Sequence, residues 1–184
     1  VEFVSAQITD SLASRIHHEG FRLNTSAFAV GSKQDADYVA NAASSSPSAR
    51  IVLDGYQFGA SYQKTIKAIG HVTLILDDYG HASHYHADFV LNQNLSASEV
   101  IYRHRDDCTQ LLLGTQYAML RREFTENDTS RGESREGICN VLVTLGGSDP
   151  ENVTSQIVVA LARIETPRFA FRILIGGSNR NLDQ

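Results

Sequence analysis

The sequence has few cysteines, no excess of basic residues and no long apolar run, and each absence excludes a class of protein. Its 16 lysines and arginines are outnumbered by 21 aspartates and glutamates, which gives a net charge of −5. A nucleic-acid-binding surface needs clustered positive charge, so we expect no nucleic-acid partner. No stretch approaches the ~18 apolar residues of a membrane span, so we expect no membrane span either.

The two cysteines, Cys108 and Cys139, lie far apart and form no CxxC pair. This usage is typical of a reduced, cytoplasmic protein rather than of an exported disulfide scaffold. The first residues, VEFVSAQITDS, have neither the basic start nor the apolar stretch of a signal peptide. With 42% hydrophobic and 20% charged residues, the chain is predicted to be globular and cytoplasmic.

Apolar runs alternate with helical periodicities along the chain, which predicts an α/β fold. Strands are expected over residues 1–5, 21–23, 50–54, 72–76, 89–92, 110–114, 138–144 and 168–175. Helices are expected over residues 9–20, 33–44, 59–70 and 150–164. The runs VTLIL, FVLN and QLLLG are apolar throughout, as in parallel strands that are buried on both faces. The sequence therefore predicts two lobes with mainly parallel sheets.

The stretch TENDTSRGESREG, residues 125–137, is the best candidate for a domain boundary. It has no apolar side chain beyond its threonine methyls, so it is predicted to be a solvated linker. The alternation of strands and helices restarts after it. We therefore predict a first lobe over residues 1–124 and a second lobe that starts at residue 138 and runs to 184.

Polar clusters directly follow three of the predicted strands. They are Asp54-Gly55-Tyr56, Asp77-Asp78 and Asn92-Gln93-Asn94. The carboxyl ends of parallel strands meet at one edge of a sheet, where ligands bind in open α/β folds. Each cluster alone is also consistent with helix capping and loop ordering. Three clusters at one edge predict a cleft.

The second lobe has a glycine-rich turn, LGGSDPEN, before its predicted helix. Gly146 and Gly147 allow close backbone approach, Asp149 suits the N-cap, and Pro150 suits the first helical position. The N–H groups of such a helix start can receive a phosphate or a sugar hydroxyl. The alternative, that these residues only shape a tight turn, is equally open.

The stretch DDYGHASHYHADFVLNQN, residues 77–94, contains three histidines and raises the question of a metal site. His81 and His84 share a face only in a helix, whereas His84 and His86 share one only in extended chain. The spacing therefore fits neither period throughout, and no cysteine supports it. We predict a polar crossover between two strands, with Asp77 and Asp78 at the edge of the cleft and no bound metal.

Four segments occur in one order: IVLDGYQFGASYQKTIK, ILDDYGHASHYHADFVLNQN, LLLGTQYAMLRREF and VLVTLGGSDPENVT. From residue 1 to about residue 182 the chain resembles the PseG/SpsG-like sugar-nucleotide hydrolases. These are relatives of the MurG-type glycosyltransferases and include spore-coat polysaccharide biosynthesis proteins. The resemblance implies a GT-B architecture, two Rossmann-like lobes facing a cleft. It also implies hydrolysis of a UDP-linked diacetamido-trideoxyhexose on the way to pseudaminic acid, with UDP as the leaving group.

The resemblance also implies which residues form the cleft. It implies that Asp54 and Tyr56 face the cleft, and these two, together with the strand-end residue Asp77, are the candidates for catalysis. A UDP-sugar is the expected small-molecule partner, with no cofactor. The expected substrate-binding residues are Asn92, Asn94, Gly146, Gly147, Ser148 and Asp149.

The chain departs from the family pattern at both ends. VEFVS matches the family's second strand, and the G-x-G-H-x-x-R turn, with its favoured acid/base histidine, is absent from residues 1–184. We therefore expect a fragment with an incomplete second lobe. We also expect UDP release at least ~100-fold slower than in a form that carries the turn. A MurG-type glycosyltransferase and a non-catalytic sugar-nucleotide-binding module remain open as alternatives.

Overall fold

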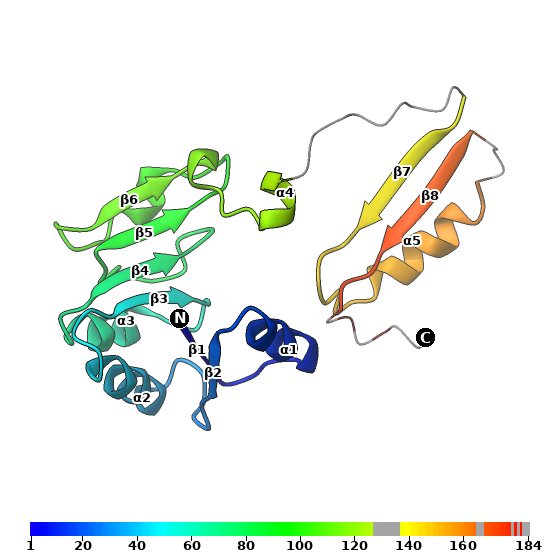
Figure 1. Cartoon of the computed structure of the whole chain (residues 1–184). Coiled ribbons are helices and arrows are strands. Elements are labelled where there is room, and N and C mark those ends of the chain that lie inside the picture. The colour runs from blue at the N-terminus through cyan, green and yellow to red at the C-terminus, as the bar shows by residue number, and fades with distance from the viewer. Residues whose placement is uncertain (127–136, 165–167, 178, 180, 182–184) are drawn as a thin grey trace. The chain divides into compact units, whose positions relative to one another are not determined.

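The computed structural model describes residues 1–126, 137–164, 168–177, 179 and 181. Every strand pair in this part of the chain is parallel, and helices lie between most successive strands, so the fold is α/β (Figure 1). Two compact units are present, one of Val1–Ile8 with Ala13–Glu126 and one of Thr9–Leu12 with Asn127–Gln184. Most of the predicted linker over 125–137 lies outside the described residues.

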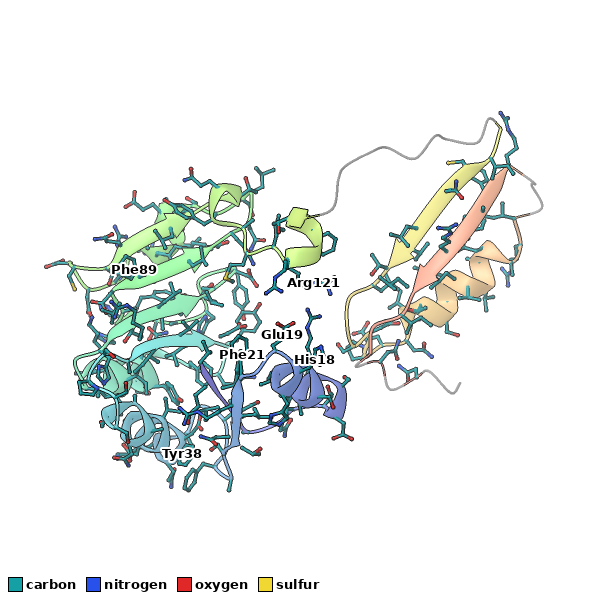
Figure 2. The ribbon with its side chains drawn as sticks, in the orientation of Figure 1. His18, Glu19, Phe21, Tyr38, Phe89 and Arg121 are labelled. Atoms are coloured by element: carbon teal, nitrogen blue, oxygen red, sulfur yellow. The ribbon has the colours of Figure 1, made fainter. Side chains whose placement is uncertain are left out.

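The larger unit contains a two-stranded and a four-stranded sheet. The small sheet pairs β1 (Glu2–Ser5) with β2 (Arg22–Thr25), and α1 (Asp10–His18) lies between them in the chain. The ring of Phe3, in β1, lies 5.8 Å from the ring of Phe21, the residue before β2. Phe21 is labelled in Figure 2. The large sheet has the order β3 (Arg50–Asp54), β4 (Val72–Leu76), β5 (Phe89–Asn92) and β6 (Gln110–Leu113).

Three helices that the sequence predicts precede β4 in the chain: α1, α2 (Lys33–Ser44) and α3 (Ala60–Lys67). Three further short helices were not predicted, η1 (Glu99–Tyr102), η2 (Thr115–Tyr117) and α4 (Arg122–Glu126). The bounds of α2, β3, β4 and β5 are the predicted ones. No helix within the described ranges is long and apolar enough to span a membrane.

One face of the four-stranded sheet carries the core. Ile51 of β3, Ile75 of β4 and Val90 of β5 are buried with Tyr62 and Ile66 of α3. The alternate residues are less protected; Val52 of β3, for example, is 57% exposed. The expectation of strands buried on both faces is met along β5 but is wrong for β4 and β6. Along β4, buried residues alternate with more exposed ones, and the residues of β6 are at most half-buried. The reason is that α3 packs on the Ile51 side alone.

From residue 137 onward, the described part of the smaller unit forms one strand–helix–strand motif. It consists of β7 (Cys139–Thr144), α5 (Val153–Leu161) and β8 (Phe169–Leu174), and the two strands pair in parallel over their whole length. A parallel pair needs a crossover, which α5 supplies. The helix begins at Val153 and not at Pro150 as predicted. Asp149 and Asn152 have positive φ angles of 36° and 52°, so the preceding turn cannot be helical.

A glycine holds the turn before α2 against the loop that follows β3. Gly31 has a φ of +74°, and a Cβ on it would lie 2.4 Å from the carbonyl oxygen of Gln57. Its N–H donates to the Asp35 carboxylate over 3.0 Å, which fixes the turn. Gln57 follows Tyr56, so this contact positions the loop that leads into the candidate site. Only glycine combines this φ with so close an approach.

We expect Gly31→Ala to lower the free energy of unfolding by more than Gly20→Ala does. Gly20 has a similar φ of +77° but open space around it, so alanine there costs only the backbone strain, about 1–2 kcal/mol. At Gly31 the clash with Gln57 adds about 1–3 kcal/mol. Urea unfolding of the two variants measures the difference. An equal loss of unfolding free energy in the two variants would show that the loop at Gln57 can move away from the added methyl group without cost.

Candidate functional site

A cleft of about 110 Å³ lies at the carboxyl ends of β3, β4 and β5. It is lined by the ends of these strands and by a segment after η2: Asp54, Tyr56, Leu76, Asp77, Asp78, Leu91, Gln93 and Met119. The structure thus brings residues of the three polar clusters together. This is the edge at which parallel α/β sheets bind ligands.

The carboxylate of Asp77 lies beneath the cleft, with a side chain that is 0% exposed. It accepts the backbone N–H groups of the next turn, from Tyr79 and Gly80 over 2.7 Å and from His81 over 3.3 Å. The side chains of His81, Tyr85 and Tyr102 also donate to it. Because these donors saturate both oxygens, Asp77 orders the turn, and its catalytic role stays a prediction without support from the geometry.

His81 is bonded at both ring nitrogens. Nδ1 bonds to Asp77, and Nε2 lies 3.3 Å from the carbonyl oxygen of Phe58. The hydrogen bond to Asp77 raises the pKa of His81, although desolvation opposes this. Burial alone would raise the pKa of Asp77, but hydrogen bonds from His81 and Tyr85 outweigh it and lower that pKa. The two residues therefore form a buried ion pair that leaves no imidazole nitrogen facing the cleft.

Asp78, the next residue, lies at the cleft surface. Its Oδ2 accepts the Tyr56 hydroxyl over 2.7 Å, and its Oδ1 accepts the Asn94 amide over 2.9 Å. The hydrogen bond to Asp78 raises the pKa of Tyr56 to about 12. Tyr56 therefore keeps its proton near neutral pH and cannot act as a base there. Its half-exposed ring and hydroxyl can instead form part of a binding surface for a ligand.

Asn92 supports the cleft from below. Its side chain is buried, and its amide donates to the Asp78 carbonyl over 2.9 Å and to the Tyr102 hydroxyl over 2.8 Å. Its Oδ1 accepts the N–H of Asn94 over 3.0 Å. Asn92 therefore positions Asp78 and Asn94, and direct substrate contact by either asparagine stays a prediction.

Asp54, at the end of β3, differs from the other two aspartates because it is exposed and its carboxylate makes no hydrogen bond or ion pair with the residues that the structure describes. Two further lining residues are bonded to each other: the N–H of Met119 donates to Gln93 Oε1 over 2.9 Å. No local pattern in the sequence predicts Met119 at the cleft, because its segment reaches the cleft only through the tertiary fold. Asp54 is the carboxylate best placed to meet a ligand.

In the smaller unit, the carboxylate of Asp149 occupies N–H groups at the start of α5, where the sequence suggested that a phosphate could bind. Its carboxylate accepts the N–H groups of Val153 and Thr154, both over 2.9 Å. A hydrogen bond from the Thr154 side chain, together with these N–H groups, lowers the pKa of Asp149. The neighbouring turns abut so closely that a Cβ on Gly176 would lie 2.4 Å from Gly147 Cα. Substrate binding by Gly146, Gly147, Ser148 and Asp149 stays a prediction, and a phosphate would have to compete with Asp149.

A larger hollow of about 470 Å³ lies beside β6. It is lined by Glu99, Arg105, Thr109, Gln110, Leu111, Leu113, Gln116 and Tyr117. Arg105 is already paired with Glu99 over 2.8 Å, and the hollow is the more open of the two. We place the candidate site at the smaller cleft, because the polar strand ends converge there.

No protein-family model matches the chain. Among curated proteins, it is similar to an uncharacterized protein of Methanocaldococcus jannaschii, with 27% identity over 117 residues. The match covers 60% of this chain and 24% of the archaeal protein's length. This likeness assigns neither a family nor an activity to the chain.

The buried pair predicts a pH dependence of stability. Because the folded pKa of His81 is raised above its ordinary 6.5, the pair's contribution is fully present below about pH 6.5 and is lost as pH rises through the raised value. At pH 6 we expect His81→Gln to cost about 3–5 kcal/mol and to flatten the alkaline loss of stability. His17→Gln, at an exposed position of α1, should leave both unchanged. Denaturant unfolding between pH 5 and 9 measures the profiles; an unchanged slope in His81→Gln would exclude the pair as its source.

Proposed function

We propose that the cleft at the carboxyl edge of β3, β4 and β5 binds the sugar of a nucleotide sugar, and that the protein hydrolyses a UDP-linked diacetamido-trideoxy sugar to release UDP. The observation that carries this proposal is the set of groups at the cleft: the carboxylates of Asp54 and Asp78, the Tyr56 hydroxyl and the Gln93 amide. Such donors and acceptors suit sugar hydroxyl and acetamido groups. The reaction needs no cofactor.

The charge of the cleft favours the sugar over the diphosphate. Its lining contains carboxylates but no lysine, arginine or histidine side chain. Carboxylates repel a diphosphate at close range, so the uncharged sugar is the part of the substrate that fits here. The resemblance of the four sequence segments to sugar-nucleotide hydrolases supports the same substrate class. Parallel sheets in both units are compatible with the GT-B architecture that we propose on that basis.

Among the residues of this chain, Asp54 is our candidate to orient the attacking water. Asp77 is saturated by hydrogen bonds, and Tyr56 holds its proton, so neither is available as a base. In the reaction, a water oxygen bonds to the anomeric carbon and gives a proton to Asp54. The bond from that carbon to the β-phosphate oxygen breaks, and UDP leaves with the electron pair.

A glycosyltransferase of the MurG type is the second candidate. The apolar side chains of Leu76, Leu91 and Met119 line the same cleft and suit an acceptor with an apolar face. In that case the acceptor hydroxyl takes the place of water, and the remaining bond changes are the same. Added acceptor would then be required for UDP release.

We expect Asp54→Asn to lower UDP release from a UDP-diacetamido-trideoxyhexose by about 10²–10⁴-fold, because it removes the proton acceptor. The matched control is Asp107→Asn, which removes an exposed carboxylate outside the cleft and should leave the rate unchanged. UDP is measured by a coupled assay, with and without sugar acceptors. Equal rates in wild type and Asp54→Asn would exclude Asp54 from the reaction.

Binding is measured in parallel by NMR shifts of the cleft residues. Binding without UDP release would identify the non-catalytic module, and release only with acceptor would identify the transferase. If the protein neither binds the nucleotide sugar nor releases UDP from it, the proposed substrate class is excluded.

A further inference from the structure

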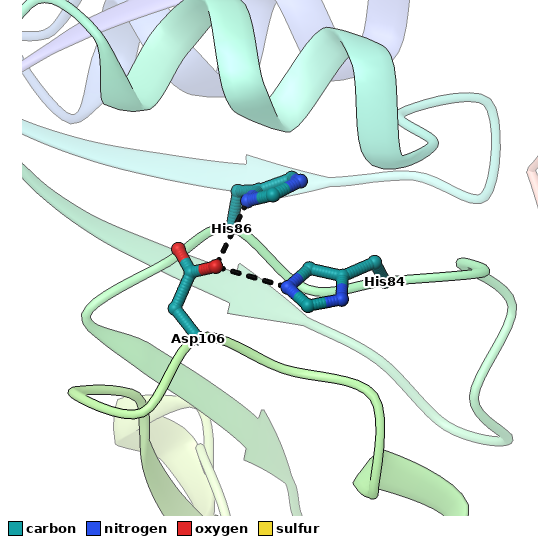
Figure 3. Close-up of side chains that lie close together, drawn as sticks. All are labelled: His84, His86 and Asp106. Atoms are coloured by element: carbon teal, nitrogen blue, oxygen red, sulfur yellow. Dashed lines mark hydrogen bonds and ion pairs between the residues drawn. The ribbon is translucent and has the colours of Figure 1, made fainter.

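His84, His86 and Asp106 come together outside the cleft, on the two connections that flank β5 (Figure 3). His84 Nε2 lies 2.9 Å and His86 Nδ1 lies 3.0 Å from the same oxygen, Oδ1 of Asp106. The centres of the two imidazole rings are 4.4 Å apart. Two imidazoles and one carboxylate thus converge on a single point.

The backbone holds this arrangement in place. Tyr85 and Arg105 form a parallel bridge, with backbone hydrogen bonds of 2.9 and 3.1 Å on either side of Tyr85. In such an extended segment His84 and His86 project to one side, while Tyr85 points to the other and is 1% exposed. The N–H of His86 also donates to the fully buried Gln63 over 3.1 Å. The ligand positions are therefore preorganised.

We propose that His84, His86 and Asp106 bind a divalent transition-metal ion, for which Zn²⁺ is the reference. Imidazole and carboxylate are ligands that zinc and its neighbours in the first transition series accept. The donor atoms all lie within 4.8 Å of one another. Zinc with ligands at ~2.0–2.1 Å in a tetrahedron separates its ligand atoms by about 3.3 Å. Small side-chain rotations therefore suffice to admit the ion.

The exposure of the ligands suits a reversible site. The side chains of His84, His86 and Asp106 are 37%, 23% and 30% exposed, so an ion can reach them from solvent. Three protein ligands leave a coordination position for water. On binding, the two ring nitrogens exchange their hydrogen bonds to Asp106 for bonds to the metal, and their protons leave or move to the outer nitrogens. The ion then links the two connections and stabilises the fold.

This inference departs from the sequence-based expectation of no metal between Asp77 and Asn94. That expectation took the three histidines as one set, with no common face. The structure separates them, because His81 is committed to Asp77, whereas the other two share a face in extended chain. The third ligand, Asp106, lies 20 residues beyond His86, where local spacing could not reveal it.

The test is zinc titration of the untagged protein by calorimetry and equilibrium dialysis. We expect one ion per chain, a rise in Tm with zinc, and visible absorption bands on replacement by Co²⁺. His84→Gln, His86→Gln and Asp106→Asn should each weaken binding by about 100-fold or more, since loss of even an outer partner typically costs about 10–100-fold. Circular dichroism confirms that each variant is folded.

His104→Gln and Cys108→Ser are the controls. Both residues are exposed and close in sequence to Asp106, yet neither belongs to the group of converging donors. They should bind zinc like the wild type. Absence of saturable binding by the wild type would overturn the proposal, as would zinc binding that survives Asp106→Asn and His84→Gln or is lost in Cys108→Ser.

Discussion

The buried carboxylate of Asp77 determines the conformation of two segments of the connection between β4 and β5, the turn directly after β4 and the extended segment around Tyr85. It accepts the N–H groups of Tyr79, Gly80 and His81, which turns the chain sharply after the strand, and this turn places Asp78 at the cleft. Its bond from Tyr85 draws that side chain inward, so His84 and His86 must face the opposite way. The sugar cleft and the metal site that we propose therefore depend on the same interaction, although they share no residue.

Environment, not residue type, gives the acidic residues of the cleft their different roles. Asp77 is desolvated but fully hydrogen-bonded, so its charge is stable and committed to the fold. Asp78 divides its two oxygens between Tyr56 and Asn94, which makes it the centre of a rigid polar surface. Asp54 has no such partner and stays open to solvent. The reactivity that we propose for this cleft is accordingly assigned to Asp54, the carboxylate that contributes least to its architecture.

Local sequence patterns were sufficient for the strands and for the edge at which polar residues gather, because apolar runs and strand-end residues act over a few positions. They could not distinguish Asp77 from Asp78, since both follow the same strand and only packing decides which is buried. They also placed the start of α5 too early, because nothing in the sequence marks the left-handed conformation of Asn152. Met119 and Asp106 join their sites through long-range contacts, which spacing cannot show.

The charges of the described groups also restrict how a nucleotide sugar can be recognised. The cleft beside Asp54 and Asp78 is lined by no positively charged side chain. At the start of α5, the N–H groups of Val153 and Thr154 already donate to the carboxylate of Asp149. Neither place is favourable for a diphosphate, whose charge needs cations or unoccupied N–H donors. In the function that we propose, discrimination at the cleft therefore acts on the sugar, through hydrogen bonds that an analogue lacking a hydroxyl or acetamido group would leave unpaired. The same cleft can then serve a hydrolase or a transferase, because sugar selection is separate from the choice of nucleophile.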